Sequence, residues 1–314
     1  MIKIKLECWW TDSHSINSRM IKQFVPSTDL RDYLFVTEKP DYTIVFSRTD
    51  WDKIETPKER TFYIAQEPLW SPNQPKDDIH DYCSKILISD KLEYINREEY
   101  IETLLPMFYA GKGENDHREI WDWSLKLKDR EFYKTKTISF IVRKGYESHY
   151  NHLVNPETSK INYGRRTELG EILSLNKNID IFGIHWENNG ENIKGEAWNK
   201  HVGLDDYKFS ICCENTIQKN YISEKFWDAV LTDTVPIYVG CLNINEYISP
   251  DCYINLTNLT FDEMIEKINN IIDNSDIYYN RHIQNIKSLK QDFFNNPNFN
   301  VWEKIKQLIG SYYE

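Results

Sequence analysis

The 314-residue chain lacks the long apolar runs and the excess of positive charge that define several large classes of protein. No run of 18 apolar residues exists, so we expect no membrane-spanning helix, and the first residues lack the apolar core of a signal peptide. Lys and Arg number 38 against 49 Asp and Glu, which gives a formal net charge of −11. General nucleic-acid binding needs a basic surface and is therefore not expected, although a few local cations would suffice for a nucleotide diphosphate.

Paired cysteines and the common phosphate-binding loops are also missing. The six cysteines form no Cys-x-x-Cys pair, and Cys212 and Cys213 are adjacent in an apolar run, so we expect buried free thiols and a reducing compartment. The absence of a Walker loop and of Gly-x-Gly-x-x-Gly argues against a nucleotide kinase or a dehydrogenase. We predict a cytoplasmic protein. Peripheral contact at the inner face of a membrane and the oligomeric state are left open.

Candidate metal ligands are scarce as well. The only Asp-x-Asp triplet is Asp50-Trp51-Asp52, and we interpret it as surface acid. His149 and His152 have the i, i+3 spacing of a helix but lack a third ligand, which disfavours a zinc site. We therefore predict no metal site.

Ten short apolar runs rich in β-branched residues alternate with helix-like stretches, of which Ser15–Phe24, Arg165–Leu175 and Ser223–Thr232 are examples. The runs are Ile2–Trp10, Tyr33–Thr37, Tyr42–Ser47, Thr61–Ala65, Lys85–Ser89, Thr137–Val142, Ile179–Ile184, Phe209–Cys213, Val235–Val239 and Cys252–Leu256. Such alternation indicates mostly parallel sheets covered on both faces. Because ten strands exceed one comfortable sheet, we predict an α/β protein of two Rossmann-like, doubly wound domains that face a cleft.

The polar, charge-rich stretch Gly111–Lys136 is the best candidate for the domain boundary. We place an N-terminal domain at residues 1–130 and a C-terminal domain at residues 131–314. Thr260–Glu314 has apolar residues at spacings of three and four, which predicts helices, and the last helix is free to pack back on the N-terminal domain. Ligands of open α/β sheets bind at the carboxyl ends of the strands, so we look for the site there.

The segment Phe209–Gly240 places polar residues directly after an apolar strand. The strand ends at the pair Glu214–Asn215, and Ser223 is a suitable N-cap for the helix that follows. Free backbone N–H groups and the positive end of the helix dipole favour a phosphate at such a start. Lys225 in the first turn is electrostatically misplaced unless an anion lies nearby. Composition alone favours a plainer alternative, in which Glu224 and Lys225 form a solvated pair on the helix surface.

The same segment resembles the donor-site signature of glycosyltransferase family 10, the α-1,3/1,4-fucosyltransferases. The signature reads E-N-x(5)-Y-[IV]-[ST]-E-K-x(8)-T-V-P-[IV]-x-x-G, and so many fixed positions over 27 residues are not expected by chance. The matching residues are Glu214, Asn215, Tyr221, Ile222, Ser223, Glu224, Lys225, Thr234, Val235, Pro236 and Gly240.

Three further landmarks of the family are present. An upstream helix carries Arg166 in the family's R-x(6)-L spacing, whereas we interpret its neighbour Arg165 as an exposed helix residue. A strand ends in the sequence Asp180-Ile-Phe-Gly183. In the N-terminal half, Glu67 follows an apolar strand and precedes Ser71-Pro72, which matches the position of the family's catalytic glutamate.

The resemblance implies a GT-B fold and an inverting transfer of L-fucose from GDP-β-L-fucose to a GlcNAc-type oligosaccharide acceptor, in α-1,3 or α-1,4 linkage. Two alternatives stay open. One keeps the fold and mechanism but uses a different nucleotide 6-deoxy- or amino-sugar as donor. The other is a non-enzymatic glycan-binding module, against which the joint presence of Glu67, Arg166 and Lys225 argues.

The resemblance also implies the roles of the site residues. Glu67 would take the proton of the acceptor hydroxyl in a single displacement. The donor would be held by the remaining residues: Arg166 and Lys225 at the diphosphate, Asn215 and Tyr221 at fucose or phosphate, and Glu224 at ribose or sugar hydroxyls. Because such cations replace a metal on the diphosphate, we expect no essential cofactor. The expected partners are the nucleotide sugar and a glycoconjugate acceptor.

Overall fold

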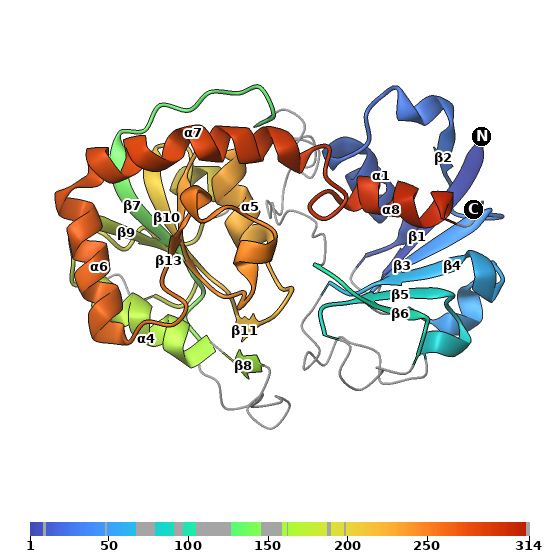
Figure 1. Cartoon of the computed structure of the whole chain (residues 1–314), viewed down its shortest axis with the longest axis horizontal. Coiled ribbons are helices and arrows are strands. Elements are labelled where there is room, and N and C mark those ends of the chain that lie inside the picture. The colour runs from blue at the N-terminus through green and yellow to red at the C-terminus, as the bar shows by residue number, and fades with distance from the viewer. Residues whose placement is uncertain are drawn as a thin grey trace. The chain divides into compact units, whose positions relative to one another are not determined.

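The computed structural model of the protein describes residues 1–8, 11–47, 49–66, 79–90, 97–104, 127–145, 159–161, 163–186, 190–197 and 199–311. These residues divide into two compact units (Figure 1). The first unit combines residues 1–104 with residues 294–311, and the second lies between residues 127 and 293. Each unit has a parallel sheet of its own, so the predicted α/β class with two parallel-sheet units is confirmed.

The first unit is built on a six-stranded sheet in the order β2-β1-β3-β4-β5-β6, in which every neighbouring pair is parallel. Its strands are β1 (Ile2–Cys8), β2 (Tyr33–Phe35), β3 (Tyr42–Phe46), β4 (Thr61–Ile64), β5 (Lys85–Ile88) and β6 (Tyr100–Glu102). The central strands β3 and β4 are buried along their whole length, which is why they read as continuous rather than alternating apolar runs. Helix α1 (Ser13–Gln23) begins where the Asp12 carboxylate accepts from the Ser15 N–H, and it packs on β1.

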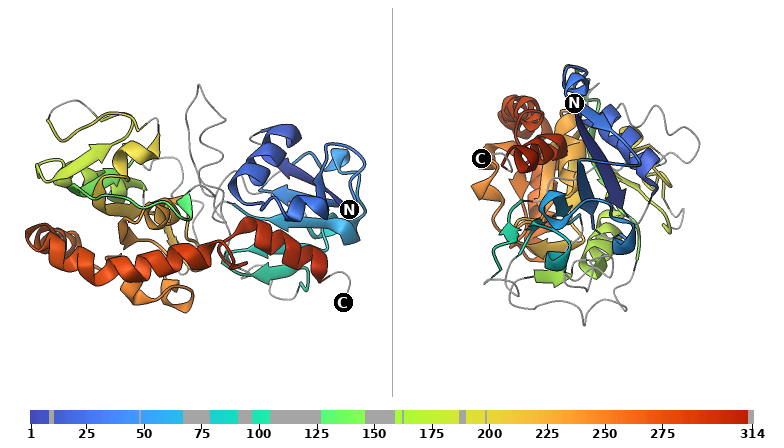
Figure 2. Two further views of the ribbon diagram at one scale, coloured as in Figure 1. Left: turned by 90° about the horizontal axis from the view of Figure 1, so that it is seen from above. Right: turned by 90° about the vertical axis from the view of Figure 1, so that its right-hand side faces the viewer.

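Helix α8 (Val301–Gly310) completes the first unit although it comes from the far end of the chain (Figures 1 and 2). The indole Nε1 of the fully buried Trp302 donates to Asp29 Oδ2 at 2.8 Å. The indole ring also packs edge-on against Tyr33, with 4.9 Å between the ring centroids. Lys306, one turn later, forms an ion pair with the same Asp29 at 2.9 Å. These contacts tie α8 to the segment between α1 and β2.

The second unit is built on a five-stranded sheet in the order β13-β12-β10-β7-β9, again parallel throughout. Its strands are β7 (Lys136–Ile141), β9 (Ile179–Phe182), β10 (Tyr207–Cys213), β12 (Val235–Val239) and β13 (Ile254–Asn255), with a separate antiparallel pair of β8 (Ser159–Ile161) and β11 (Thr216–Gln218). Its helices are α4 (Tyr163–Leu173), α5 (Glu224–Leu231), α6 (Phe261–Asp273) and α7 (Ser275–Phe293). Helices α5 and α7 pack against β10 and β12.

The strand order of the second sheet identifies its ligand-binding edge. From β7 the chain continues to β9 on one side of the sheet, and it then returns to the other side, where β10, β12 and β13 follow in order. The direction in which strands are added therefore reverses between β7 and β10. Doubly wound sheets bind ligands beyond the carboxyl ends of the strands at such a reversal. Glu214 and Asn215 follow β10 directly and therefore lie at this point of the sheet.

All ten predicted strands are present. Val235–Val239 has the predicted ends, and the ends of the others lie within two residues of the prediction. Strands β6, β8 and β11 were not predicted, and β11 falls in a segment that we had expected to be a loop. Each has only three residues, which is too short for a recognisable hydrophobic period. All six cysteines are buried, as was expected of Cys212 and Cys213, and none is in a disulfide. In the part of the chain that the structure describes, no helix is both long and apolar enough to cross a membrane.

The two units divide at positions that differ from the boundary we expected after residue 130. Residues 127–130 group with the second unit, because the Arg130 carbonyl accepts from Lys290 Nζ at 2.8 Å and the Lys128 carbonyl accepts from Gln291 Nε2 at 2.8 Å. Residues 294–311 group with the first unit through α8. The division is therefore not a single cut in the sequence.

Candidate functional site

Glu214, the first residue after β10, holds the start of helix α5 in place. Its side chain is fully buried, and its carboxylate accepts from the Ser223 N–H at 2.7 Å and from the Ser223 Oγ at 2.5 Å. Ser223 is the N-cap of α5, as predicted, and its Oγ accepts from the Lys225 N–H. Burial raises the pKa of Glu214. This carboxyl group therefore fixes where α5 begins relative to the end of β10.

Gly240, at the end of β12, leaves the space that the Glu214 side chain occupies. A Cβ at this position would overlap the Glu214 side chain and the Tyr238 ring and hydroxyl. The Tyr238 hydroxyl in turn lies 3.4 Å from Glu214 Oε1. The glycine that ends the matched motif, Gly240, is thus needed because the glutamate that begins the motif, Glu214, packs against it.

Replacing Gly240 by Ala is expected to lower the free energy of unfolding by about 1–3 kcal/mol, because the added methyl group overpacks a buried site. Thermal or urea denaturation measures this change. Gly145→Ala is the matched control, since a Cβ there meets nothing within 4 Å. A Gly240→Ala variant as stable as the Gly145→Ala variant would contradict the packing role of Gly240.

Lys225 lies among acidic groups at the start of α5. Its Nζ is 3.0 Å from Ser223 Oγ, 3.2 Å from Glu224 Oε1 and 3.7 Å from Glu214 Oε2. Burial lowers the Lys225 pKa, but the charges of Glu224 and Glu214 raise it above its ordinary value. The alternative of a solvated surface pair is wrong, because the Lys225 and Glu224 side chains are only 23% and 22% exposed.

Two residues that the sequence did not single out complete this cluster. Lys200, on the short 3-10 helix η7 (Lys200–Gly203), forms an ion pair with Asp228 and lies 3.5 Å from Glu224 Oε1. Burial raises the pKa of Asp228 to about 6 despite this lysine. For Glu224, burial would raise the pKa, but Lys225 and Lys200 together hold it below its ordinary value. The spacing of Glu224 and Asp228 was a usable signal, because residues four apart share one helix face.

The structure also places the two arginines of α4. Arg166 is 6% exposed, and repulsion by its positive charge lowers the Lys225 pKa, although the carboxylates around Lys225 outweigh it. Arg165 was expected to be an exposed helix residue, and this expectation is wrong. Its guanidinium donates to the Leu259 carbonyl at 2.6 Å and lies over the Phe261 ring, so it ties α4 to the start of α6.

Asn215 and Tyr221 differ in what they offer to a ligand. Among the described residues, none donates a hydrogen bond to the buried Oδ1 of Asn215. This oxygen is therefore an available acceptor at the carboxyl end of β10. Tyr221 is 3% exposed, and its carbonyl lies 3.4 Å from the Tyr238 hydroxyl. The predicted contacts of these two residues with fucose or phosphate stay predictions.

Several predicted features lie outside the described residues, namely Glu67, Ser71, Pro72, His149 and His152. Two others are described. Asp50 and Asp52 are exposed, and Asp50 pairs with Lys53 at 3.0 Å, which agrees with their interpretation as surface acid. Asp180 accepts from the Tyr207 hydroxyl at 2.6 Å.

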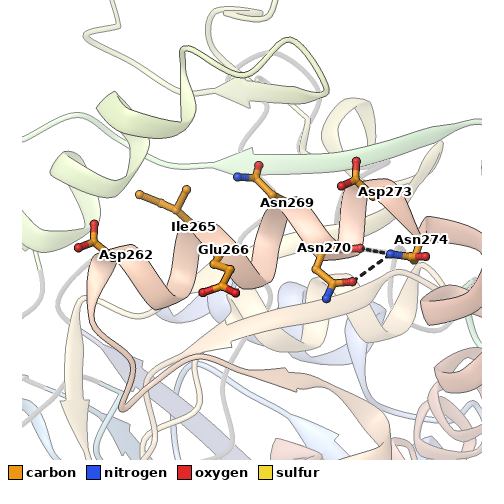
Figure 3. A pocket seen from close by; sticks show the side chains of 7 residues that line it. All are labelled: Asp262, Ile265, Glu266, Asn269, Asn270, Asp273 and Asn274. Atoms are coloured by element: carbon orange, nitrogen blue, oxygen red, sulfur yellow. Dashed lines mark hydrogen bonds between the residues drawn. The ribbon is translucent and has the colours of Figure 1, made fainter.

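A hollow of about 620 Å³ lies elsewhere in the second unit, along α6 (Figure 3). It is lined by Asp262, Ile265, Glu266, Asn269, Asn270, Asp273 and Asn274. All seven come from this helix and its C-cap, and three are acidic. None of the predicted donor-binding residues lines the hollow, and its acidic side chains would repel a diphosphate.

A family model described as glycosyltransferase family 10 (fucosyltransferase), C-terminal part, matches residues 148–303, about half of the chain. This range contains Arg166 and the whole cluster around α5. An α-(1,3)-fucosyltransferase of Helicobacter pylori is 24% identical over 322 residues, which cover 90% of this chain and 60% of that protein. A putative fucosyltransferase-like protein of Arabidopsis thaliana is 31% identical over 105 residues, which cover 33% of this chain and 19% of that protein. The chain therefore spans less than two thirds of the length of either relative.

Solved structures show the same fold. A crystal structure of an α1,3-fucosyltransferase with GDP aligns with a TM-score of 0.51 at 17% identity and covers 94% of this chain and 89% of that one. A DNA-modifying β-glucosyltransferase also aligns with a TM-score of 0.51, at 12% identity, and covers 98% of this chain and 100% of that one. The two parallel-sheet units therefore have the GT-B fold.

Proposed function

The chain belongs to glycosyltransferase family 10, and from this membership we propose that it transfers L-fucose from GDP-β-L-fucose to a hydroxyl of a GlcNAc-type oligosaccharide or glycoconjugate. The observation that carries the proposal is the contact of Lys225 with Glu224 at the start of α5, 3.2 Å apart, where the charge of the buried Arg166 also acts on Lys225. Two cations beside a helix start suit a diphosphate, and a carboxylate held beside them suits the hydroxyls of ribose or sugar.

The proposed reaction is a single displacement with inversion. A bond forms between the acceptor oxygen and the anomeric carbon of fucose while the bond from that carbon to the β-phosphate oxygen breaks, and GDP leaves. Glu67 takes the proton of the acceptor hydroxyl. Arg166, Lys225 and the N–H groups at the start of α5 stabilise the negative charge that grows on the departing diphosphate. With these charges in place, we propose that no divalent metal is essential.

The donor end of the site is supported by its electrostatics. Glu224 is held ionised by the charges of Lys225 and Lys200, so it is an acceptor for hydroxyl groups rather than a proton donor. Asn215 Oδ1 adds a second buried acceptor. Glu224 lies directly beside two lysines, and a carboxylate next to cations suits a charged diphosphate joined to polyhydroxylated rings.

Calorimetry against a panel of nucleotide sugars tests the donor. We expect GDP and GDP-fucose to bind and UDP- and dTDP-sugars to bind much more weakly. Tight binding of a UDP- or dTDP-sugar in their place would favour the alternative donor. Failure to bind any of them would overturn the proposal and favour a glycan-binding module.

Release of GDP from GDP-fucose in the presence of a galactosyl–N-acetylglucosamine acceptor tests the transfer. The linkage of the product, α-1,3 or α-1,4, follows from analysis of the isolated glycan, and its anomeric configuration tests inversion. The cytoplasmic location expected from the sequence stays a prediction.

A further inference from the structure

Lys200 links two carboxylates that lie one turn apart on α5. Its Nζ forms an ion pair with Asp228 and lies 3.5 Å from Glu224 Oε1. The lysine comes from η7, a segment with no other part in the site, and its side chain is only 17% exposed. Asp228 is buried to 99%, since 1% of its side chain is exposed. The result is a row that runs outward from the buried Asp228 carboxylate through the Lys200 ammonium to the partly exposed, proposed donor-binding carboxylate of Glu224.

We propose that Lys200 is a positioning residue that holds Glu224 in its donor-binding orientation, and that Asp228 anchors Lys200 for this task. The inference rests on the proposed function, because it assigns Lys200 to the donor site described above. Lys200 itself need not touch the donor.

The geometry separates this role from that of an ordinary structural ion pair. An ion pair that served stability alone would need only Lys200 and Asp228, whereas Lys200 also lies beside Glu224. Lys225 contacts the same oxygen, Oε1, at 3.2 Å. Because two ammonium groups from different segments converge on Oε1, the carboxylate is held from two directions. A site residue needs this kind of support, because a long side chain otherwise samples several rotamers.

The role of Asp228 follows from its burial. Burial raises its pKa to about 6, which shows that the ionised carboxylate is held at a cost inside the unit. Lys200 has the opposite response, because Asp228 and Glu224 raise its pKa although burial alone would lower it. A buried carboxylate without its cation is strongly unfavourable, so Asp228 keeps the Lys200 ammonium at this depth beside Glu224.

Calorimetry of the full chain with GDP-fucose tests the proposal through Lys200→Met. Removal of the ammonium should raise the Kd for GDP-fucose about tenfold, in the range expected for loss of one charge-assisted contact. Lys208→Met is the matched control, because Lys208 is similarly buried at 19% exposure but pairs with the 81% exposed Asp276. We expect the Kd of this control to stay within about twofold of the unsubstituted chain, as for a surface pair.

Lys200→Met also leaves Asp228 without its cation, so the variant will melt at a lower temperature and its loss of affinity alone would be ambiguous. The double variant Lys200→Met/Asp228→Asn removes the stranded charge and should recover most of the melting temperature. If Lys200 positions Glu224, the double variant keeps the tenfold weaker binding despite its recovered stability. Asp228→Asn alone should weaken binding, but it should add little in the Lys200→Met background.

The outcomes separate the inference from the function on which it rests. Recovery of GDP-fucose affinity together with melting temperature in the double variant would overturn the positioning role, and so would a Lys200→Met Kd equal to that of Lys208→Met. Absence of GDP-fucose binding in the unsubstituted chain would overturn the proposed function itself, and that failure is visible before any variant is made.

Discussion

Lys225→Met is expected to lower kcat/KM for transfer from GDP-fucose by about 100- to 1,000-fold, the range for loss of one preorganised group that stabilises transition-state charge. The ammonium would face the β-phosphate oxygen that gains charge as fucose departs. An ammonium has three N–H donors, and Lys225 Nζ donates to Ser223 Oγ and Glu224 Oε1 within 3.2 Å. Glu214 Oε2, at 3.7 Å, is beyond hydrogen-bond distance, so the third donor can serve a phosphate oxygen. The effect is measured as the initial rate of GDP release at GDP-fucose concentrations below KM.

The control for Lys225 must separate lost charge from lost folding. Lys208→Met removes a lysine from the same unit at a comparable exposure, 19% against 23%, and should leave turnover unchanged. The melting temperature of Lys225→Met should fall only modestly, since Glu214 already has a raised pKa and can take up a proton when its cation is lost. Turnover by Lys225→Met at the level of Lys208→Met would remove Lys225 from the proposed mechanism.

Glu67→Gln is expected to lower the rate of transfer by about 100- to 10,000-fold, the range for loss of a general base. The amide has the shape of the carboxylate but cannot accept the proton of the acceptor hydroxyl. Because the donor residues lie in the second unit, the Kd for GDP-fucose should stay unchanged. Single-turnover transfer and calorimetry on the same preparation measure the two quantities.

A neighbouring substitution gives the matched control for Glu67. Gln66→Glu changes the charge of the preceding residue, whose N–H donates to Ser47 Oγ at 3.1 Å at the end of β4, and it should not abolish transfer. Unchanged turnover in Glu67→Gln would show that another group takes the proton. A loss of GDP-fucose binding in parallel with turnover would instead place Glu67 at the donor.

Most strands of the two sheets could be predicted from the sequence, because buried parallel strands have continuous apolar sequences. Val235–Val239 is an example, since all five of its residues are buried and its predicted ends are those observed. The cap at Ser223 was also predictable, because a capping side chain accepts a hydrogen bond from a backbone N–H only two residues further along the chain. Local patterns of this kind need no knowledge of distant contacts.

Contacts between distant segments could not be predicted in this way. Lys200 precedes Asp228 by 28 residues and lies on a short 3-10 helix without a motif, so nothing local marks it as part of the site. Arg165 was judged by its helix alone, whereas its partners are a carbonyl and a ring that start α6. Gly240 was recognised by resemblance, but the reason for it became clear only with Glu214 beside it.

The return of α8 to the first unit has a consequence for the order in which the protein can fold as it is synthesised. Trp302 meets Asp29 across 273 residues, so the ribosome must deliver the whole second unit before that contact can close. The second unit, whose described residues end at 293, can complete its own sheet first. The N-terminal unit, although made earliest, is finished last, and a fragment that stops short of residue 302 leaves Asp29 and Tyr33 facing water.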